Sequence, residues 1–269
     1  MRQALRTSAL AIILLGLILF APPLNRPLID GLQVVADLFD QRPERSVLFI
    51  GNSRTFFHDM PKMVRKIADS AGFSEKLRIE MHAPAAESLA AHWANPEVQA
   101  LLDQSWNHVV FQVQSGEQLS DRYSGQVWQI AANLIREAEA AGAAPAMFVT
   151  WRYTDQCSED LGLPASAYAG MHRNIQQQHA RLARTTGVDL VNVGLVWEHL
   201  LNQATDFSLY QDCNHPSIYG SYLSALMFYA YLSGGDVDAV RYSPDGIEPG
   251  QAELLRSQVS AFLSQQVAR

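Results

Sequence analysis

Short runs of consecutive apolar residues alternate along this chain with longer segments in which apolar residues recur every three to four positions. The apolar runs predict five buried β-strands, and the periodic segments predict helices between them. Strands that read as continuous apolar runs are buried on both faces, and helices that connect parallel strands cover those faces. The pattern therefore predicts a three-layer α/β/α domain around a five-stranded parallel sheet.

The predicted strands cover residues 47–50, 77–81, 108–114, 146–151 and 188–193. The predicted helices cover residues 61–71, 96–102, 125–141, 168–185, 196–202, 218–232 and 251–266. Open parallel sheets bind their ligands at the carboxyl ends of the strands. Ser53, Gln114, Trp151 and Arg152 lie at or just past such ends, so a functional site is expected there.

The N-terminal residues 1–24 differ from the rest of the chain. Arg2 and Arg6 precede an uncharged apolar run at residues 9–24, which is typical of a secretory signal peptide or a short membrane anchor. Pro22 and Pro23 disfavour cleavage after Ala21, so an uncleaved apolar helix in the inner membrane is preferred over a cleaved signal. In both cases residues 25–45 form a linker, and residues 46–269 form an exported domain, periplasmic or secreted.

Composition narrows the class of protein further. With 48% hydrophobic residues among 269, the chain is globular rather than disordered. A net charge of −7 argues against nucleic acid as a partner, because such binding needs a basic surface. The two cysteines, Cys157 and Cys213, are either free thiols or a disulfide, and the free thiols are slightly favoured.

Two short segments carry the residues of a nucleophilic site. Ser53 follows the first predicted strand after Gly51 and Asn52, and Asp212 precedes His215 by three residues. A serine nucleophile needs a base, and the base needs a carboxylate that orients its ring. Each segment alone also fits a turn or a helix cap. Together they predict a triad of Ser53, His215 and Asp212.

Four segments, in this order, resemble the motif blocks of the SGNH (GDSL-like) hydrolase superfamily. Residues 50–53 (Ile-Gly-Asn-Ser) resemble the first block, and residues 82–89 resemble the second, with Ala86 where a glycine is usual. Residues 110–115 stand where the third block, Gly-x-Asn-Asp, would be, and their Gln-x-Gln-Ser resembles a bacterial subgroup. Residues 212–217 resemble the Asp-x-x-His block. The subgroup resemblance extends to residues 150–152, 193–197 and 220–225.

The resemblance implies a flavodoxin-like fold and a role for each candidate residue. Ser53 would attack an ester carbonyl, His215 would take the serine proton, and Asp212 would orient the imidazole. The oxyanion would be held by the backbone N–H groups of Ser53 and Ala86 and by the amide of Gln114. No metal or organic cofactor is implied, and His172 and His179 are interpreted as a surface pair. Candidate substrate-binding residues are Asn52, Trp151 and Arg152.

These expectations converge on a serine esterase that hydrolyses short acyl esters, with O-acetyl groups on carbohydrates as candidate substrates. Two alternatives remain: an O-acyltransferase acting on envelope polysaccharide, and a non-catalytic carbohydrate-binding protein with the same fold. A long-chain lipase is disfavoured, because the sequence has no lid-like insertion.

Overall fold

The computed structural model describes residues 40–119, 124–157 and 170–267. The predicted N-terminal helix and most of the predicted linker lie outside these residues. Within them, no helix is both long and apolar enough to cross a membrane.

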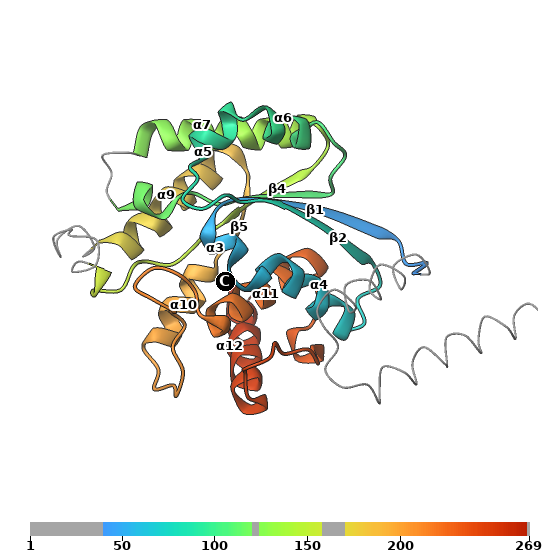
Figure 1. Cartoon of the computed structure of the whole chain (residues 1–269), viewed down its shortest axis with the longest axis vertical. Helices are drawn as coiled ribbons and strands as arrows, with labels where there is room; N and C mark the ends of the chain where they lie inside the picture. The colour runs from blue at the N-terminus through green and yellow to red at the C-terminus, as the bar shows by residue number, and fades with distance from the viewer. Residues whose placement is uncertain (1–39, 120–123, 158–169, 268–269) are drawn as a thin grey trace, which may run out of the picture. The chain divides into compact units, whose positions relative to one another are not determined.

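Five strands form one parallel sheet, as the apolar runs predict (Figure 1). They are β1 (Glu44–Ile50), β2 (Lys76–His82), β3 (His108–Phe111), β4 (Ala144–Phe148) and β5 (Asp189–Val191). Their order across the sheet is β2-β1-β3-β4-β5, and every neighbouring pair is parallel. The predicted fold class is therefore confirmed.

Three strands end earlier than predicted. β3 ends at Phe111 rather than at residue 114. It pairs with β1 only as far as Phe111 opposite Ile50, because β1 ends where the chain turns at Gly51. β4 ends at Phe148 rather than at residue 151. β5 ends at Val191, because Val193 already begins a helix.

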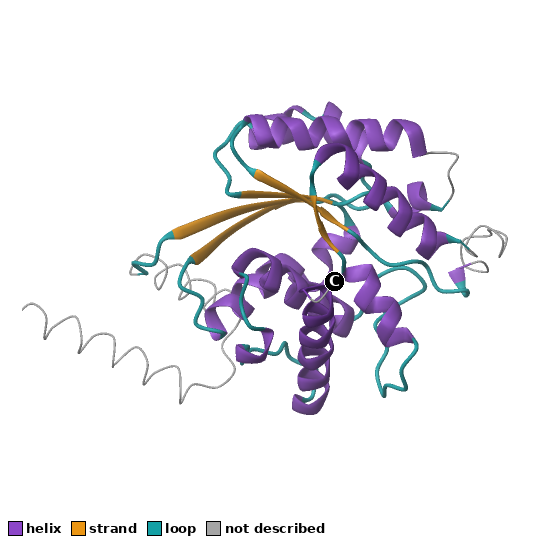
Figure 2. Ribbon diagram, turned by 180° about the vertical axis from the view of Figure 1, so that it is seen from behind, coloured by secondary structure: helices purple, strands orange, loops and turns teal. Residues whose placement is uncertain are grey.

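Helices cover both faces of the sheet (Figure 2). Along β1, Val47 and Phe49 point to one core, and Leu48 and Ile50 point to the other, as the two-residue period of a strand requires. The first core is closed by α4 (Met60–Ser70), α10 (Val193–Leu201), α11 (Ile218–Ser233) and α12 (Pro249–Val267). The second is closed by α5 (Leu89–Ala94), α6 (Pro96–Leu102), α7 (Ser124–Ala140) and α9 (Met171–Thr186).

The strand order places the end of β1 at a topological switch point. The chain moves outward from β1 to β2 in one direction, and from β3 through β4 to β5 in the other. In open parallel sheets, ligands bind where the order reverses, which here is at the carboxyl ends of β1 and β3. Ser53 lies three residues beyond the end of β1, at this position.

Gly51 makes the turn after β1 possible. A Cβ atom at this position would lie 2.3 Å from Thr55 Oγ1 and 2.9 Å from Gln112 Oε1. Both distances are shorter than real Cβ contacts, so only glycine allows the chain to bend this closely against β3.

Candidate active site

The nucleophile candidate begins a one-turn helix, α3 (Ser53–Phe56). Asn52 caps this helix: its Oδ1 accepts from the Arg54 N–H at 3.3 Å, and its Nδ2 donates to the Glu87 carbonyl at 3.0 Å. The Asn52 N–H donates to Gln112 Oε1 at 3.0 Å, and the residue is 3% exposed. Asn52 therefore holds the turn together, and its binding of substrate stays a prediction.

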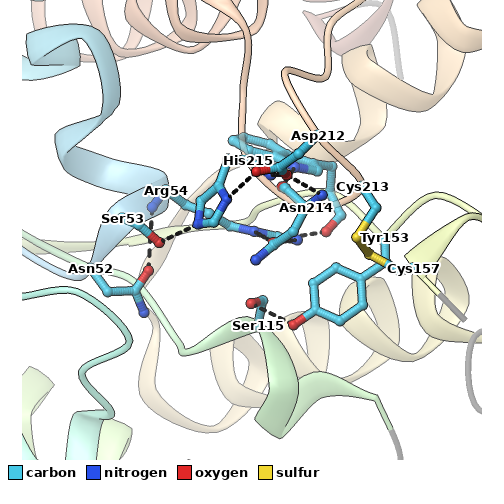
Figure 3. Close-up of polar contacts among 11 residues, drawn as sticks. Asn52, Ser53, Arg54, Ser115, Tyr153, Cys157, Asp212, Cys213, Asn214 and His215 are labelled. Atoms are coloured by element: carbon cyan, nitrogen blue, oxygen red, sulfur yellow. Dashed lines mark hydrogen bonds and ion pairs between the residues drawn. A yellow bond between two sulfur atoms is a disulfide. The ribbon is translucent and has the colours of Figure 1, made fainter. Parts of the chain in front are cut away.

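The structure brings Ser53, His215 and Asp212 together (Figure 3). Ser53 Oγ lies 3.0 Å from His215 Nε2, and His215 Nδ1 lies 2.7 Å from Asp212 Oδ2. This order of atoms matches a nucleophile, a base and an orienting carboxylate. Their catalytic roles stay a prediction.

Asp212 also organises the loop around it. Its Oδ1 accepts from the backbone N–H of Asn214 at 2.7 Å and of His215 at 2.6 Å. Burial alone would raise the pKa of this carboxyl, but these N–H groups and the His215 ring together hold the pKa below its usual value. Asp212 is therefore an anion at neutral pH, as a partner of an imidazolium must be.

The catalytic loop, residues 209–217, is tied at both sides. Tyr210 and Pro216 form an antiparallel bridge, and the Ser217 hydroxyl caps α11 by accepting from the Gly220 N–H. Cys213 is joined to Cys157 in a disulfide, with Cα atoms 5.0 Å apart. The preference for free thiols is wrong, because the segment after β4 and the catalytic loop meet at the same edge of the sheet.

The predicted oxyanion donors come from three separate segments: the start of α3, the loop after β2 and the loop after β3. Across the described residues, the backbone N–H groups of Ser53 and Ala86 have no hydrogen-bond acceptor. Ala86 has a φ of +59°, the left-handed conformation that favours glycine. Gln114 Oε1 accepts from the Glu117 N–H at 3.0 Å. This bond fixes the orientation of the side-chain amide, so its NH₂ group is the part that can donate to an oxyanion. Their roles at the oxyanion stay predictions.

Two predicted substrate-binding residues, Trp151 and Arg152, make structural contacts. Trp151 is 1% exposed and stacks on Trp197 with ring centroids 3.8 Å apart, while its Nε1 donates to the Asn214 carbonyl at 3.0 Å. Trp151 therefore supports the catalytic loop from within the core. Arg152 pairs with Glu198 of α10, with Nε and Oε2 3.1 Å apart. Substrate binding by these two residues stays a prediction.

The sequence interpretation missed Arg54. Its side chain is 1% exposed, and Nε and Nη2 donate to Asn214 Oδ1 at 3.0 and 2.8 Å. Nη1 donates to Thr150 Oγ1 at 2.9 Å and to the Trp151 carbonyl at 2.5 Å. Arg54 thus connects the nucleophile's helix to the catalytic loop and to the end of β4. The only available signal was its position beside Ser53.

Metal-ligating residues are scattered in the part of the chain that the structure describes. No group of three or more His, Cys, Asp or Glu side chains there could hold a metal ion. His179 is 1% exposed and bonds the Ile175 carbonyl through Nδ1 at 2.8 Å. The interpretation of His172 and His179 as a surface pair is therefore wrong for His179, which faces the core beside Trp128.

Comparison with solved structures finds the same fold among hydrolases. A protein of Slackia heliotrinireducens, described as a candidate SGNH hydrolase, is 27% identical, with a TM-score of 0.57 over 71% of this chain and 100% of that chain. A DUF4886 family protein from Bacteroides uniformis is 18% identical, with a TM-score of 0.68 over 82% of this chain and 95% of that chain.

A variant of an acetyl-xylooligosaccharide esterase from Geobacillus stearothermophilus is 15% identical, with a TM-score of 0.59 over 75% of this chain and 99% of that chain. No protein-family model and no curated protein matches the chain. The structural similarities confirm the fold that the four motif blocks predict.

Proposed function

Because the chain has the SGNH hydrolase fold, we propose that it is a serine esterase that hydrolyses short acyl esters. The observation that carries this proposal is the pair of hydrogen bonds from Asp212 Oδ2 to His215 Nδ1 and from His215 Nε2 to Ser53 Oγ. This arrangement supplies a nucleophile, a base for its proton and an anion for the resulting imidazolium.

In the first half of the reaction, Ser53 Oγ bonds to the ester carbonyl carbon while its proton moves to His215 Nε2. The tetrahedral oxyanion is held by the N–H groups of Ser53 and Ala86 and by the Gln114 amide; losing one such donor costs about 3–4 kcal/mol of transition-state stabilisation. The carbon–oxygen bond to the alcohol then breaks, and His215 gives its proton to the leaving oxygen. An acyl-serine and a free alcohol result.

In the second half, water attacks the acyl-serine and gives a proton to His215 Nε2. The carbon–Oγ bond breaks, the proton returns to Ser53, and the carboxylic acid leaves. Asp212 keeps the proton of the neutral imidazole on Nδ1, so that Nε2 is free to accept in both halves.

We propose acetylated carbohydrates as the substrate class. Structures that share this fold include an acetyl-xylooligosaccharide esterase and an acetyl xylan esterase. Their names specify acetylated xylan or xylooligosaccharide. The proposed mechanism needs only an ester carbonyl and an alcohol leaving group, which an acetylated carbohydrate supplies.

We also propose that the domain works outside the cytoplasm, tethered by the apolar run at residues 9–24 or secreted. The disulfide between Cys157 and Cys213 supports export, because disulfides persist in oxidising compartments.

The experiment is hydrolysis of p-nitrophenyl acetate and longer p-nitrophenyl esters by the wild type and by Ser53→Ala. The substitution should lower kcat by at least about 10³-fold, because the nucleophile is lost. Ser257→Ala, on α12, is the matched control and should keep the wild-type rate. Equal rates for wild type and Ser53→Ala would contradict the serine mechanism. No turnover by the wild type would contradict hydrolysis and favour acyl transfer to a polysaccharide hydroxyl.

A further inference from the structure

Arg54 sets the orientation of the Asn214 amide. Two guanidinium N–H groups converge on Asn214 Oδ1, at 3.0 and 2.8 Å. A guanidinium has donors and no acceptor, so a flipped amide would place its NH₂ group against two other donors. Asn214 therefore has one allowed orientation, in which Nδ2 points away from Arg54.

The guanidinium is held rigidly. It is bonded to Thr150 and to the Trp151 carbonyl, and it lies 4.9 Å from the Trp151 ring centre and 5.3 Å from that of Tyr153. Burial lowers the pKa of Arg54 to about 10, which still leaves it charged at neutral pH. Arg54 therefore cannot turn away or lose a proton to accommodate the other amide orientation.

The backbone N–H and carbonyl of Asn214 also have hydrogen-bond partners. Its N–H donates to Asp212 Oδ1 at 2.7 Å, and its carbonyl accepts from Trp151 Nε1 at 3.0 Å. Among the described residues, the hydrogen bonds of Asn214 involve its Oδ1, N–H and carbonyl but not Nδ2, and the residue is partly exposed. Figure 3 shows the side chain extending toward the space between the His215 ring and the bonded pair of Ser115 and Tyr153. The Nδ2 group of Asn214 is therefore a donor of fixed orientation that lies near the His215 ring.

We propose that Asn214 is a substrate-binding residue whose Nδ2 donates a hydrogen bond to an oxygen of the alcohol portion of the ester. The inference rests on the proposed esterase function and specifies its substrate. Because Nδ2 can only donate, it selects alcohols that carry an acceptor oxygen beside the ester, as the hydroxyl and ring oxygens of a sugar do. A p-nitrophenyl ester has no such oxygen next to its ester group.

The test compares kcat/KM for an acetylated xyloside with kcat/KM for p-nitrophenyl acetate, in full-length wild type, Asn214→Ala and Asn214→Asp. Aspartate keeps an acceptor for Arg54 but presents an oxygen in place of the donor, so it tests the same hydrogen bond without removing the side chain. In both variants the ratio of the two constants should fall about tenfold, the effect of losing one hydrogen bond. Asn202→Ala, at the end of α10, is the matched control and should keep the wild-type ratio.

The ratio separates binding from support of the loop. If Asn214 only supports the loop, both constants fall together and the ratio stays at the wild-type value, which would overturn the inference. Wild-type activity on p-nitrophenyl acetate without activity on the acetylated xyloside would also overturn it, and the proposed esterase function would stand. Turnover of neither ester in a Ser53-dependent way would contradict the proposed function itself.

Discussion

The ring of Phe57 lies parallel to the ring of His215, with centroids 4.5 Å apart and an angle of 5° between the planes. Phe57 begins the short helix η1 (Phe57–Asp59), which directly follows α3, so Ser53 and the ring that packs on His215 come from adjacent turns. The contact restricts rotation of the imidazole about its axis. It therefore keeps Nε2 directed at Ser53 and Nδ1 directed at Asp212.

Phe57→Leu should lower kcat more than it changes KM. Aromatic pairs contribute about 0.5–1.5 kcal/mol beyond the area they bury, so we expect kcat for p-nitrophenyl acetate to fall about three- to tenfold. A stacked ring also stabilises the imidazolium form, which develops in both halves of the proposed reaction.

Phe207→Leu provides the control, because Phe207 stacks on Tyr219 with similar geometry, 4.5 Å and 12°. That variant should keep the wild-type kcat even if it is less stable. A kcat for Phe57→Leu equal to that of Phe207→Leu would show that the stacking has no role in the reaction.

The sequence predicts the strands and the grouping of Ser53, Asp212 and His215, because each of these has its own sequence pattern. Apolar runs predict the strands because a buried parallel strand needs apolar side chains on both faces, as Leu48 and Phe49 have. They carry no information about which strands are neighbours, so the order β2-β1-β3-β4-β5 follows only from the flavodoxin-like fold that the resemblance implies. Ser53, Asp212 and His215 could be grouped because each stands in a short motif with a chemical reason for its spacing.

Arg54 and Trp151 could not be interpreted correctly from the sequence. An arginine beside a nucleophile is usually exposed, but the partners of Arg54 lie 96 to 160 positions away, at Thr150 and Asn214. An aromatic residue at the end of a strand fits a binding site as well as a core. The stack of Trp151 on Trp197, which places the ring of Trp151 in the core, depends on how α10 packs.

Reduction of the disulfide should loosen the catalytic loop. Cys213 directly follows Asp212, and its carbonyl accepts from the Thr154 N–H at 2.9 Å, so the bridge anchors the carboxylate to the segment after β4. Cross-linking residues 56 positions apart stabilises a fold by about 4 kcal/mol in the chain-entropy treatment. We expect a reductant to lower both the melting temperature and kcat for p-nitrophenyl acetate.

A double variant, Cys157→Ser with Cys213→Ser, should match the reduced wild type and be insensitive to reductant. Thiol counting by mass spectrometry would verify that the bond is broken. A reduced protein with wild-type kcat and melting temperature would show that the bridge supports neither the loop nor the fold.

Ala86→Gly should stabilise the protein without loss of activity. Alanine at φ +59° is strained by about 1–2 kcal/mol, and the greater freedom of an unfolded glycine offsets part of this gain. We expect the free energy of unfolding to rise by about 0.5–1 kcal/mol in urea titrations. The backbone N–H that is proposed to hold the oxyanion is retained, so kcat should be unchanged or higher.

The neighbouring Ala85 is the matched control for this change. It is exposed and does not have a positive φ, so Ala85→Gly should lower the free energy of unfolding by about 0.5–1 kcal/mol. Equal effects at the two positions would contradict the argument from strain.

His179 should make the protein less stable in weak acid. Burial lowers its pKa to about 4, and its Nε2 is buried without a hydrogen-bond partner in the described part of the chain. An unfolded histidine takes up a proton below about pH 6.5, whereas the folded one stays neutral until about pH 4. Between these values the unfolded state binds more protons, so stability falls as the pH falls. From pH 7 to pH 5 the loss from this group should be about 2 kcal/mol.

Urea unfolding at pH 7 and pH 5 tests this expectation in the wild type and in His179→Gln. The glutamine variant cannot take up the proton, so its free energy of unfolding should fall by about 2 kcal/mol less than that of the wild type between the two pH values. His199→Gln, at an exposed position of α10, should keep the wild-type pH dependence. If wild type and His179→Gln lose equal stability between pH 7 and pH 5, the buried imidazole is not what makes the fold sensitive to acid.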